Sequence, residues 1–366
     1  MLVKCPNCGV EVPAGDCCGE CGWAGPATGP AGTEWPERPA GYVVGEHFVI
    51  TDRSDTAPDA GVRWYRGRDM GDGQTVLIKE ATAEGAAQLQ REYEILTALS
   101  HPAVPRALAL VPGDGSLFLV LQDTSGAPLA RAWRREGVTE AERLDWLVQL
   151  CDALAEIHAH DVVYLAVHPE RLLVTEGGRL ILGDFSLARR LPIDPRDRLV
   201  ACDPYSAPEV FLSPGEVDGQ VDVYGIGATW YSLLLGNPLG AEHFEEMFFP
   251  RPPLDFLPDL LPAVNRIVVK AMQRSRGRRY RSVLQLRDAL EEVKLELGRD
   301  RPAGWGACSD TGIARHANED SYLVEEFRAG AEESVPGRLC VVADGMGGEA
   351  GGATASRMTV RALAEA

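Results

Sequence analysis

Strand-like and helix-like segments alternate from Tyr42 to about Leu297 without an extended break, and this alternation limits the fold more than any other feature of the chain. Residues 62–69 and 74–80 predict a hairpin closed by a Gly-Asp-Gly turn. Apolar residues at helical spacing predict helices over residues 84–99, 140–158, 222–235 and 283–297. We therefore expect one α+β unit over residues 41–297.

Two stretches without apolar periodicity divide the rest of the chain. Residues 24–40 are rich in Pro, Gly and Ala, and residues 298–304 read GRDRPAG, so both are expected to be linkers. They separate a cysteine cluster over residues 1–23 and a C-terminal segment over residues 305–366 from the central unit. A length of 366 residues fits two to three domains.

The charge and hydropathy of the chain argue against several classes of partner. The formal net charge is −18, whereas nucleic acids and anionic membranes are bound by clustered Lys and Arg side chains. No apolar run approaches the roughly 18 residues of a transmembrane helix. Residues 1–12 also lack the apolar core of a secretory signal. We expect a cytoplasmic protein that binds neither nucleic acid nor membrane.

Five of the nine cysteines lie within residues 5–21. Cys5 and Cys8 form one C-x-x-C pair, and Cys18 and Cys21 form a second pair, with nine residues between the two pairs. Two such pairs supply the four thiolates of a tetrahedral structural zinc site, which a reducing compartment favours. The segment resembles the short zinc ribbons that begin many bacterial multidomain proteins. A disordered tail with incidental cysteines is the alternative.

A series of short motifs runs through the central unit. They are Val76-Leu77-Ile78-Lys79, Arg91-Glu92, Ser100-His101-Pro102, Gly183-Asp184-Phe185-Ser186, Ala207-Pro208-Glu209, Asp222-Val223-Tyr224-Gly225 and Arg278-Arg279-Tyr280. In this order the motifs resemble those of the Ser/Thr protein kinase family. The resemblance covers about residues 42–297 and implies a bilobal kinase fold.

The resemblance assigns roles to the retained residues. Lys79 and Glu92 correspond to the ion pair that holds the α- and β-phosphates of ATP, and Asp184 corresponds to the aspartate that holds Mg²⁺. Glu209 and Arg279 correspond to an ion pair that supports the architecture. The retained residues leave nucleotide binding open.

Residues 164–174 keep the scaffold of a kinase catalytic loop but lose its reactive groups. Ala166 stands where the family has the catalytic Asp, which accepts the proton of the substrate hydroxyl. Arg171 stands where an Asn holds the second metal ion. Because an alanine methyl cannot accept a proton, we expect a pseudokinase with no catalytic residue of its own.

Further departures affect the nucleotide site. The loop over residues 52–61 holds one Gly in place of the family's G-x-G-x-x-G cover, which weakens its approach to phosphates. Trp64 aligns with the small apolar residue that caps the adenine, and an indole there can fill the pocket. A divergent active kinase is one alternative, with a repurposed site on His168 or Asp161. A scaffold that binds neither nucleotide nor catalytic metal is the other.

The C-terminal segment carries a second set of motifs. Residues 309–320 read SDTGIARHANED, and residues 342–348 read VADGMGG. Together they resemble the start of the PPM-type metal-dependent Ser/Thr protein phosphatases. The resemblance covers residues 305–366 and implies the incomplete beginning of an α/β sandwich. Phosphatase activity is expected only if the domain is completed beyond Ala366, because the family's further Asp ligands come from a later part of its domain.

The phosphatase resemblance carries over residue by residue. Arg315 corresponds to the residue that holds the substrate phosphate, and Glu319 to one that holds a metal-bound water. Asp320 and Asp344, with the Gly345 carbonyl, correspond to ligands of a two-metal Mg²⁺ or Mn²⁺ centre.

These resemblances predict three modules: a zinc ribbon, a bilobal protein-kinase-like fold and the start of a PPM-type phosphatase. The expected function is Ser/Thr phospho-signalling of the bacterial type, with the pseudokinase regulating or scaffolding the phosphatase. The expected partners are phosphoproteins or signalling proteins.

Overall fold

The computed structural model describes most of the chain between residues 35 and 298 and parts of both ends. The described residues are 2–4, 11–13, 35, 37–54, 61–83, 85–113, 115–193, 204–246, 249–298, 321–329, 335–343, 355–356, 358–359 and 361–362. The chain divides into two compact units, residues 1–298 and residues 299–366.

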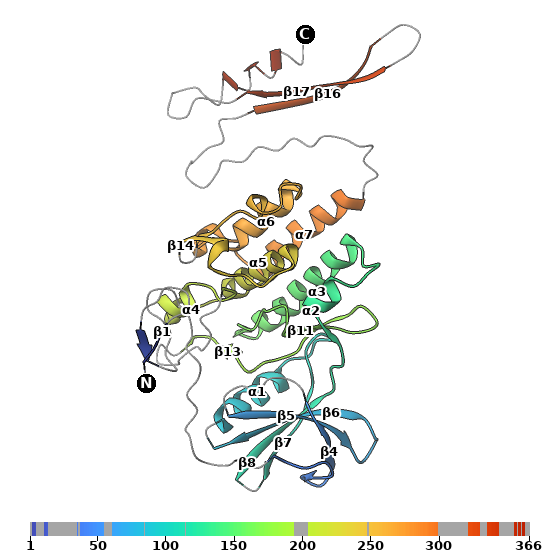
Figure 1. Cartoon of the computed structure of the whole chain (residues 1–366), viewed down its shortest axis with the longest axis vertical. Coiled ribbons are helices and arrows are strands. Elements are labelled where there is room, and N and C mark those ends of the chain that lie inside the picture. Colours follow the sequence, from blue (N-terminus) through green and yellow to red (C-terminus); the bar gives the residue numbers. More distant parts are fainter. Residues whose placement is uncertain are drawn as a thin grey trace. The chain divides into compact units, whose positions relative to one another are not determined.

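The first unit contains a lobe built on an antiparallel six-stranded sheet (Figure 1). In spatial order its strands are β3 (Val43–Val44), β4 (Phe48–Arg53), β5 (Val62–Asp69), β6 (Thr75–Thr82), β8 (Ser116–Gln122) and β7 (Ala107–Gly113). Helix α1 (Ala86–Ala98) follows β6 and contacts β6, β7 and β8. The hairpin predicted over residues 62–80 is confirmed as β5 and β6.

The sheet buries apolar residues on both faces because side chains alternate along each strand. Trp64 and Leu119 belong to the main core, which continues into the helical lobe. Tyr65, Ile78 and Phe118 point to the other face and form a second, smaller core. Successive residues on β5 and β6 therefore pack into different cores.

Part of the segment predicted to be a linker packs on that second face. The Arg38 guanidinium donates to the Glu80 carboxylate at 2.8 Å and lies 4.7 Å from the centre of the Tyr42 ring. Trp35 stacks on the guanidinium of Arg63 at 4.3 Å. Glu80 is fully buried, so the pairing with Arg38 compensates a charge that burial would otherwise penalise. The ordered lobe thus begins before residue 41.

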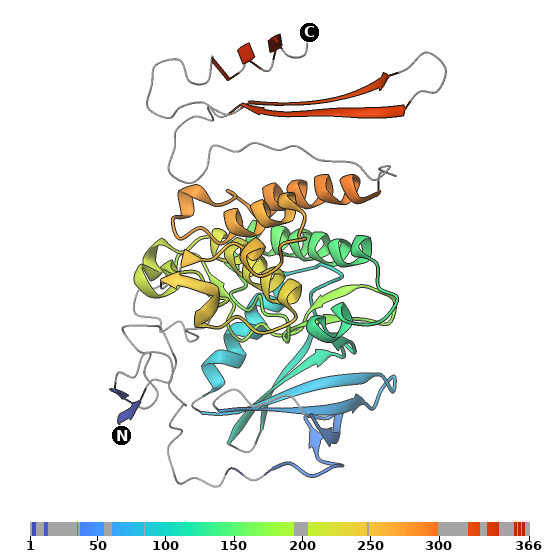
Figure 2. The same cartoon turned by 45° about the horizontal axis from the view of Figure 1, so that its top comes forward.

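The second lobe of this unit is mainly helical, as Figure 2 shows. Its helices are α2 (Leu129–Trp133), α3 (Glu140–Ala159), α4 (Glu209–Leu212), α5 (Gln220–Leu235), α6 (Pro262–Ala271) and α7 (Val283–Gly298). A capping box begins α3: Thr139 accepts from the Glu142 N–H, and the Glu142 carboxylate accepts from the Thr139 N–H. Helix α5 is buried from Val221 to Leu233, which explains its almost wholly apolar sequence.

Short strands complete the helical lobe and position its loops. They are β9 (Ala127–Pro128), β10 (Val162–Val163), β11 (Leu172–Val174), β12 (Leu180–Leu182), β13 (Arg189–Arg190), β14 (Phe244–Glu246) and β15 (Phe249–Pro250). Strand β11 pairs with β12 and β9, and β10 pairs with β13. The two ends of the catalytic-loop stretch are therefore tied to short strands.

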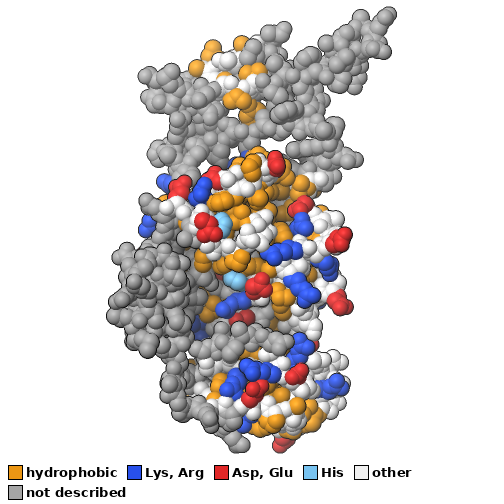
Figure 3. Space-filling model, viewed as in Figure 1, with side chains coloured by type: hydrophobic (Ala, Val, Ile, Leu, Met, Phe, Trp, Pro, Cys, Tyr) orange, Lys and Arg blue, Asp and Glu red, His pale blue; other side chains and the backbone are white. Residues whose placement is uncertain are grey.

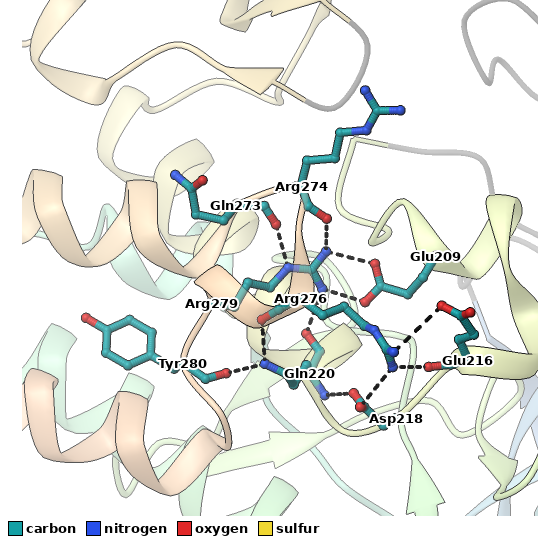
Figure 4. A network of polar contacts seen from close by, with 9 residues as sticks. All are labelled: Glu209, Glu216, Asp218, Gln220, Gln273, Arg274, Arg276, Arg279 and Tyr280. Atoms are coloured by element: carbon teal, nitrogen blue, oxygen red, sulfur yellow. Dashed lines mark hydrogen bonds and ion pairs between the residues drawn. The ribbon is translucent and has the colours of Figure 1, made fainter. Parts of the chain in front are cut away.

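The predicted architectural pair of Glu209 and Arg279 is confirmed. Two guanidinium nitrogens of Arg279 donate to the two carboxylate oxygens of Glu209, at 2.5 and 2.8 Å (Figure 4). The same guanidinium also donates to the carbonyl oxygens of Gln220, Gln273 and Arg274. This network joins the start of α4 to the loop between α6 and α7.

Outside the two lobes the structure describes short elements only. Strands β1 (Leu2–Lys4) and β2 (Glu11–Pro13) pair antiparallel, and in the second unit β16 (Ser321–Ala329) pairs with β17 (Val335–Ala343) over nine residues. The residues assigned to the zinc site and to the phosphatase centre lie outside the described residues: Cys5, Cys8, Cys18, Cys21, Arg315, Glu319, Asp320, Asp344 and Gly345.

Candidate functional site

Lys79 and Glu92 form a buried ion pair between strand β6 and helix α1. The Lys79 ammonium lies 2.5 Å from a Glu92 carboxylate oxygen, and each side chain is only 1% exposed. Lys79 points to the face of the sheet that belongs to the main core, since its neighbour Glu80 occupies the other face. The sequence motifs correctly predicted this pairing.

Asp184 joins this pair from the helical lobe. It follows β12 by two residues, and one of its carboxylate oxygens lies 3.0 Å from the Lys79 ammonium. Ser186 donates its N–H to the same oxygen at 3.1 Å and its hydroxyl to the other oxygen at 2.9 Å. Ser186, which replaces the family's Gly, thus closes a tight turn around the carboxylate.

Arg171 occupies the remaining side of Asp184. Its guanidinium lies 3.1 Å from the second carboxylate oxygen, the one that also accepts from the Ser186 hydroxyl. Gly183 makes this approach possible: its N–H donates to the Arg171 carbonyl, and a Cβ at Gly183 would lie 2.6 Å from that oxygen. The pairing of β11 with β12 therefore brings Arg171 and Asp184 together.

Charged neighbours outweigh burial in setting the pKa values of Asp184 and Lys79. Burial by itself raises the pKa of the Asp184 carboxyl, but the charges of Lys79 and Arg171 outweigh it and hold that pKa below its usual value. Burial lowers the pKa of the Lys79 ammonium, but Asp184 and Glu92 together raise it above its usual value. Lys79 is therefore charged, and so is Asp184, at neutral pH.

Ala166 lies on the loop after β10 and is 1% exposed. Helix α5 holds the backbone on both sides of it. Asp222 accepts from the N–H groups of Tyr164 and Leu165 at 2.9 and 2.8 Å, and Thr229 donates to the Val167 carbonyl at 3.1 Å. The loop therefore keeps an ordered backbone around a position with no reactive side chain.

The anchoring of this loop stores local strain. Leu165 has a φ of +60°, a left-handed conformation that costs a branched residue on the order of 1–3 kcal/mol. Asp222 stabilises it, and it also accepts from His158 at 2.8 Å while being fully buried. The Asp222 carboxylate thus accepts hydrogen bonds both from α3 and from the loop.

Aromatic rings surround the loop. The rings of Tyr164 and Phe185 meet edge to face, with their centres 5.1 Å apart. The rings of His168 and Tyr205 are 4.3 Å apart, and the Nδ1 atom of His168 accepts from the Glu170 N–H at 3.2 Å. Burial, reinforced by the charge of Arg171, lowers the pKa of His168 to about 4. His168 is therefore neutral at neutral pH.

Trp64 packs against Lys79, the lysine of the buried ion pair. Its ring centre lies 4.0 Å from the Lys79 ammonium, and the two residues are directly paired across β5 and β6. The indole is 8% exposed, so it is packed inside the lobe. This contact is a cation–π interaction, which gains strength where water is excluded.

The charged residues around Asp184 do not fit a magnesium centre. Both oxygens of Asp184 already face cations, and the position of the second metal ligand holds the guanidinium of Arg171, which has no atom to donate to a metal. In the part of the chain that the structure describes, no group of three or more His, Cys, Asp or Glu side chains is placed to hold a metal ion.

Sequence reasoning identified several of these residues but not their contacts. Arg171 was recognised as a replacement for an Asn, yet nothing in the local sequence indicates that it pairs with Asp184. Ser186 and Asp222 were recognised only as members of family motifs, without their partners. The helical spacing of Asp222, Gly225 and Thr229 was the available signal, since residues at such spacing share one face.

Acidic and basic side chains are interspersed over the helical lobe on the face shown in Figure 3. None of the described helices combines the length and apolar composition needed to cross a membrane.

A sheet lobe with a buried Lys–Glu pair, joined to a helical lobe that anchors a loop on a buried Asp, defines a bilobal protein-kinase-like fold. A solved structure with this fold is the autoinhibited serine kinase domain of the giant muscle protein titin. It matches with a TM-score of 0.58 at 19% identity and covers 69% of this chain and 80% of the titin chain. At that identity the likeness shows the fold alone.

The protein kinase domain profile matches residues 62–248, just over half of the chain. The chain therefore belongs to the protein kinase family. CBL-interacting protein kinase 25 of Oryza sativa subsp. japonica is 30% identical over 60% of this chain and 48% of its own length. Serine/threonine-protein kinase Pkn1 of Myxococcus xanthus is 25% identical over 68% of this chain and 40% of its own length. The chain thus spans less than half of either relative.

Proposed function

We propose that this chain is a Ser/Thr phospho-signalling protein whose kinase domain is a pseudokinase that regulates or scaffolds, and does not transfer phosphate. One observation carries the proposal. Ala166 occupies the position of the catalytic Asp on a loop whose backbone is otherwise held in place by Asp222 and Thr229. A positioned general base contributes about 100- to 10,000-fold to such reactions, and a methyl group contributes none of it.

The state of Asp184 supports the same conclusion. In active kinases this aspartate holds the metal ion that neutralises the phosphates. Here its two oxygens face Lys79 and Arg171, so the carboxylate is already compensated. The alternative of a divergent active kinase requires a different base. His168 is a weak candidate, because its depressed pKa of about 4 makes it a poor proton acceptor at neutral pH.

The rest of the proposal rests on sequence resemblance. The four cysteines near the N-terminus are proposed to hold a structural zinc ion, and residues 305–366 are proposed to begin a PPM-type phosphatase domain. The kinase-fold domain would then bind phosphoproteins or signalling partners and influence phosphatase output. We place the protein in the cytoplasm on composition alone.

The scaffold alternative, with neither nucleotide nor metal bound, draws support from Trp64. Its indole contacts Lys79 on the side of the sheet that faces the main core. The indole and the phosphates of a bound nucleotide would compete for contact with the Lys79 ammonium group.

Phosphate transfer is tested with the full chain and radiolabelled ATP, on itself and on general protein substrates. The matched controls are Lys79→Met and Asp184→Ala. We expect the wild-type chain to incorporate no more phosphate than either variant. Incorporation that disappears in both variants would establish an active kinase and reject the proposal.

A further inference from the structure

Four charged side chains connect the sheet lobe to the helical lobe. Glu92 comes from α1 and Lys79 from β6 in the sheet lobe, whereas Asp184 and Arg171 come from the stretch around β11 and β12 in the helical lobe. Each member contacts the next: Glu92 to Lys79 at 2.5 Å, Lys79 to Asp184 at 3.0 Å, and Asp184 to Arg171 at 3.1 Å. The contacts form one chain of alternating charge.

The Asp184 carboxylate is compensated within this ion chain without any ligand, because each of its oxygens faces a different cation. A divalent metal ion at Asp184 would have to displace the Arg171 guanidinium or stand close to it. Like charges at such distances repel strongly where water is largely excluded, and Asp184 is only 8% exposed.

The position of Arg171 is built into the fold. Its carbonyl accepts the N–H of Gly183, and its own N–H donates to the His168 carbonyl at 3.0 Å. Both backbone polar groups of Arg171 are thus hydrogen-bonded, and from this position its guanidinium reaches the Asp184 carboxylate. An arginine is always protonated at physiological pH, so the positive charge is permanent.

We propose that the Arg171 guanidinium replaces a divalent metal ion at Asp184, so that the cleft excludes metal and an internal ion chain joins the two lobes. This inference rests on the proposed pseudokinase function and specifies why its site would not respond to divalent metal ions. A kinase cleft normally changes with bound metal and nucleotide. Here the ion chain from Glu92 to Arg171 would keep the same contacts at any metal concentration.

The test counts bound Mn²⁺ by electron paramagnetic resonance, using the full chain after removal of metal with a chelator. The proposed phosphatase residues can also bind Mn²⁺, so the informative quantity is the difference between each protein and its Asp184→Asn counterpart. We expect the wild type and Asp184→Asn to bind equally. We expect Arg171→Asn to bind one ion more than the Arg171→Asn/Asp184→Asn double variant.

Thermal unfolding in chelator provides the second readout. Arg171→Asn should lower the melting temperature by about 2–4 °C, because Asp184 loses one of its two cations. Arg179→Asn is the matched control, since Arg179 is exposed on the turn between β11 and β12. It should change the melting temperature by no more than about 1 °C. Arg171→Gln replaces Arg171→Asn if the latter does not fold.

Two results overturn the inference. One is a wild-type chain that binds an extra Mn²⁺ relative to Asp184→Asn. The other is a folded Arg171 variant that gains no Mn²⁺, because Arg171 is then not what excludes the metal. Either result leaves the pseudokinase proposal standing if no phosphate is transferred. Phosphate transfer that depends on Lys79 rejects that proposal whatever the Mn²⁺ count.

Discussion

Two of the three guanidinium nitrogens of Arg279 contact the two carboxylate oxygens of Glu209, 70 positions earlier in the chain, at 2.5 and 2.8 Å. Both residues are buried, so neither charge has water to compensate it. The pair ties the short helix α4 to the loop before α7. Its geometry is the two-point arrangement that makes Arg–carboxylate pairs strong.

Breaking this pair should destabilise the helical lobe severely. We expect Arg279→Leu to lower the free energy of unfolding by about 3–5 kcal/mol, since Glu209 would be left as an unpaired buried charge. Urea unfolding measures the change. Arg276→Leu is the control, because Arg276 pairs with the half-exposed Asp218 (Figure 4) and should contribute no more than about 1 kcal/mol. Equal losses in both variants would contradict the assignment.

Replacing Asp222 should loosen the loop that carries Ala166. Asp222→Asn presents one carbonyl oxygen where three donors now converge. At least one donor is left unsatisfied, at a cost of about 1–3 kcal/mol. Hydrogen exchange should accelerate at the amides of Tyr164 and Leu165 in particular. Asp218→Asn, at a half-exposed position just before α5, should leave both amides protected. Unchanged protection in Asp222→Asn would show that the loop is held by other contacts.

His168 should make the wild-type chain less stable as the pH falls. Its pKa is about 4 in the folded chain and about 6.5 in the unfolded chain. Between these values the unfolded chain binds a proton that the folded chain does not, so stability is present above pH ~6.5 and decreases as the pH falls. The limiting slope is about 1.4 kcal/mol per pH unit.

The variant His168→Gln isolates this contribution, because glutamine does not titrate. We expect the free energy of unfolding, measured in urea at several pH values, to fall more steeply for the wild type than for the variant between pH ~6.5 and ~4. Parallel curves would mean that His168 is protonated in the folded chain as readily as in the unfolded chain.

Trp64 should control access of nucleotide to Lys79. We expect Trp64→Val to lose roughly 3 kcal/mol of stability, from the lost packing of the indole. ATP should raise the melting temperature of this variant by more than it raises that of the wild type. Trp146→Val, a buried tryptophan on α3, serves as the control and should lose stability without gaining a response to ATP. A Trp64→Val variant indifferent to ATP would mean that the indole is not what limits binding.

Much of the central domain was predictable because its signals are local. The hairpin of β5 and β6 follows from alternating strands around a glycine turn, and the α3 helix follows from its apolar spacing. The pairing of Lys79 with Glu92 was predicted from family motifs and not from periodicity. The zinc and phosphatase assignments depend on the same kind of resemblance and stay predictions.

The start of the ordered lobe was predicted less well. The composition of residues 24–40 indicates a linker, but Arg38 pairs with the buried Glu80 and Trp35 stacks on Arg63. Proline and glycine content reports the freedom of an isolated chain. It carries no information on a distant carboxylate that can hold one end of the segment in place.

The sequence by itself determined which groups the cleft lost and which it kept, because replacing a catalytic Asp by Ala166 removes a proton acceptor in any fold. Only the tertiary structure decided what the remaining charges do. Arg171 and Asp184 are 13 positions apart, and they meet because β11 pairs with β12 and Gly183 allows the backbones to approach. Charge compensation in a buried site depends on distances of a few ångströms, which only the folded chain defines.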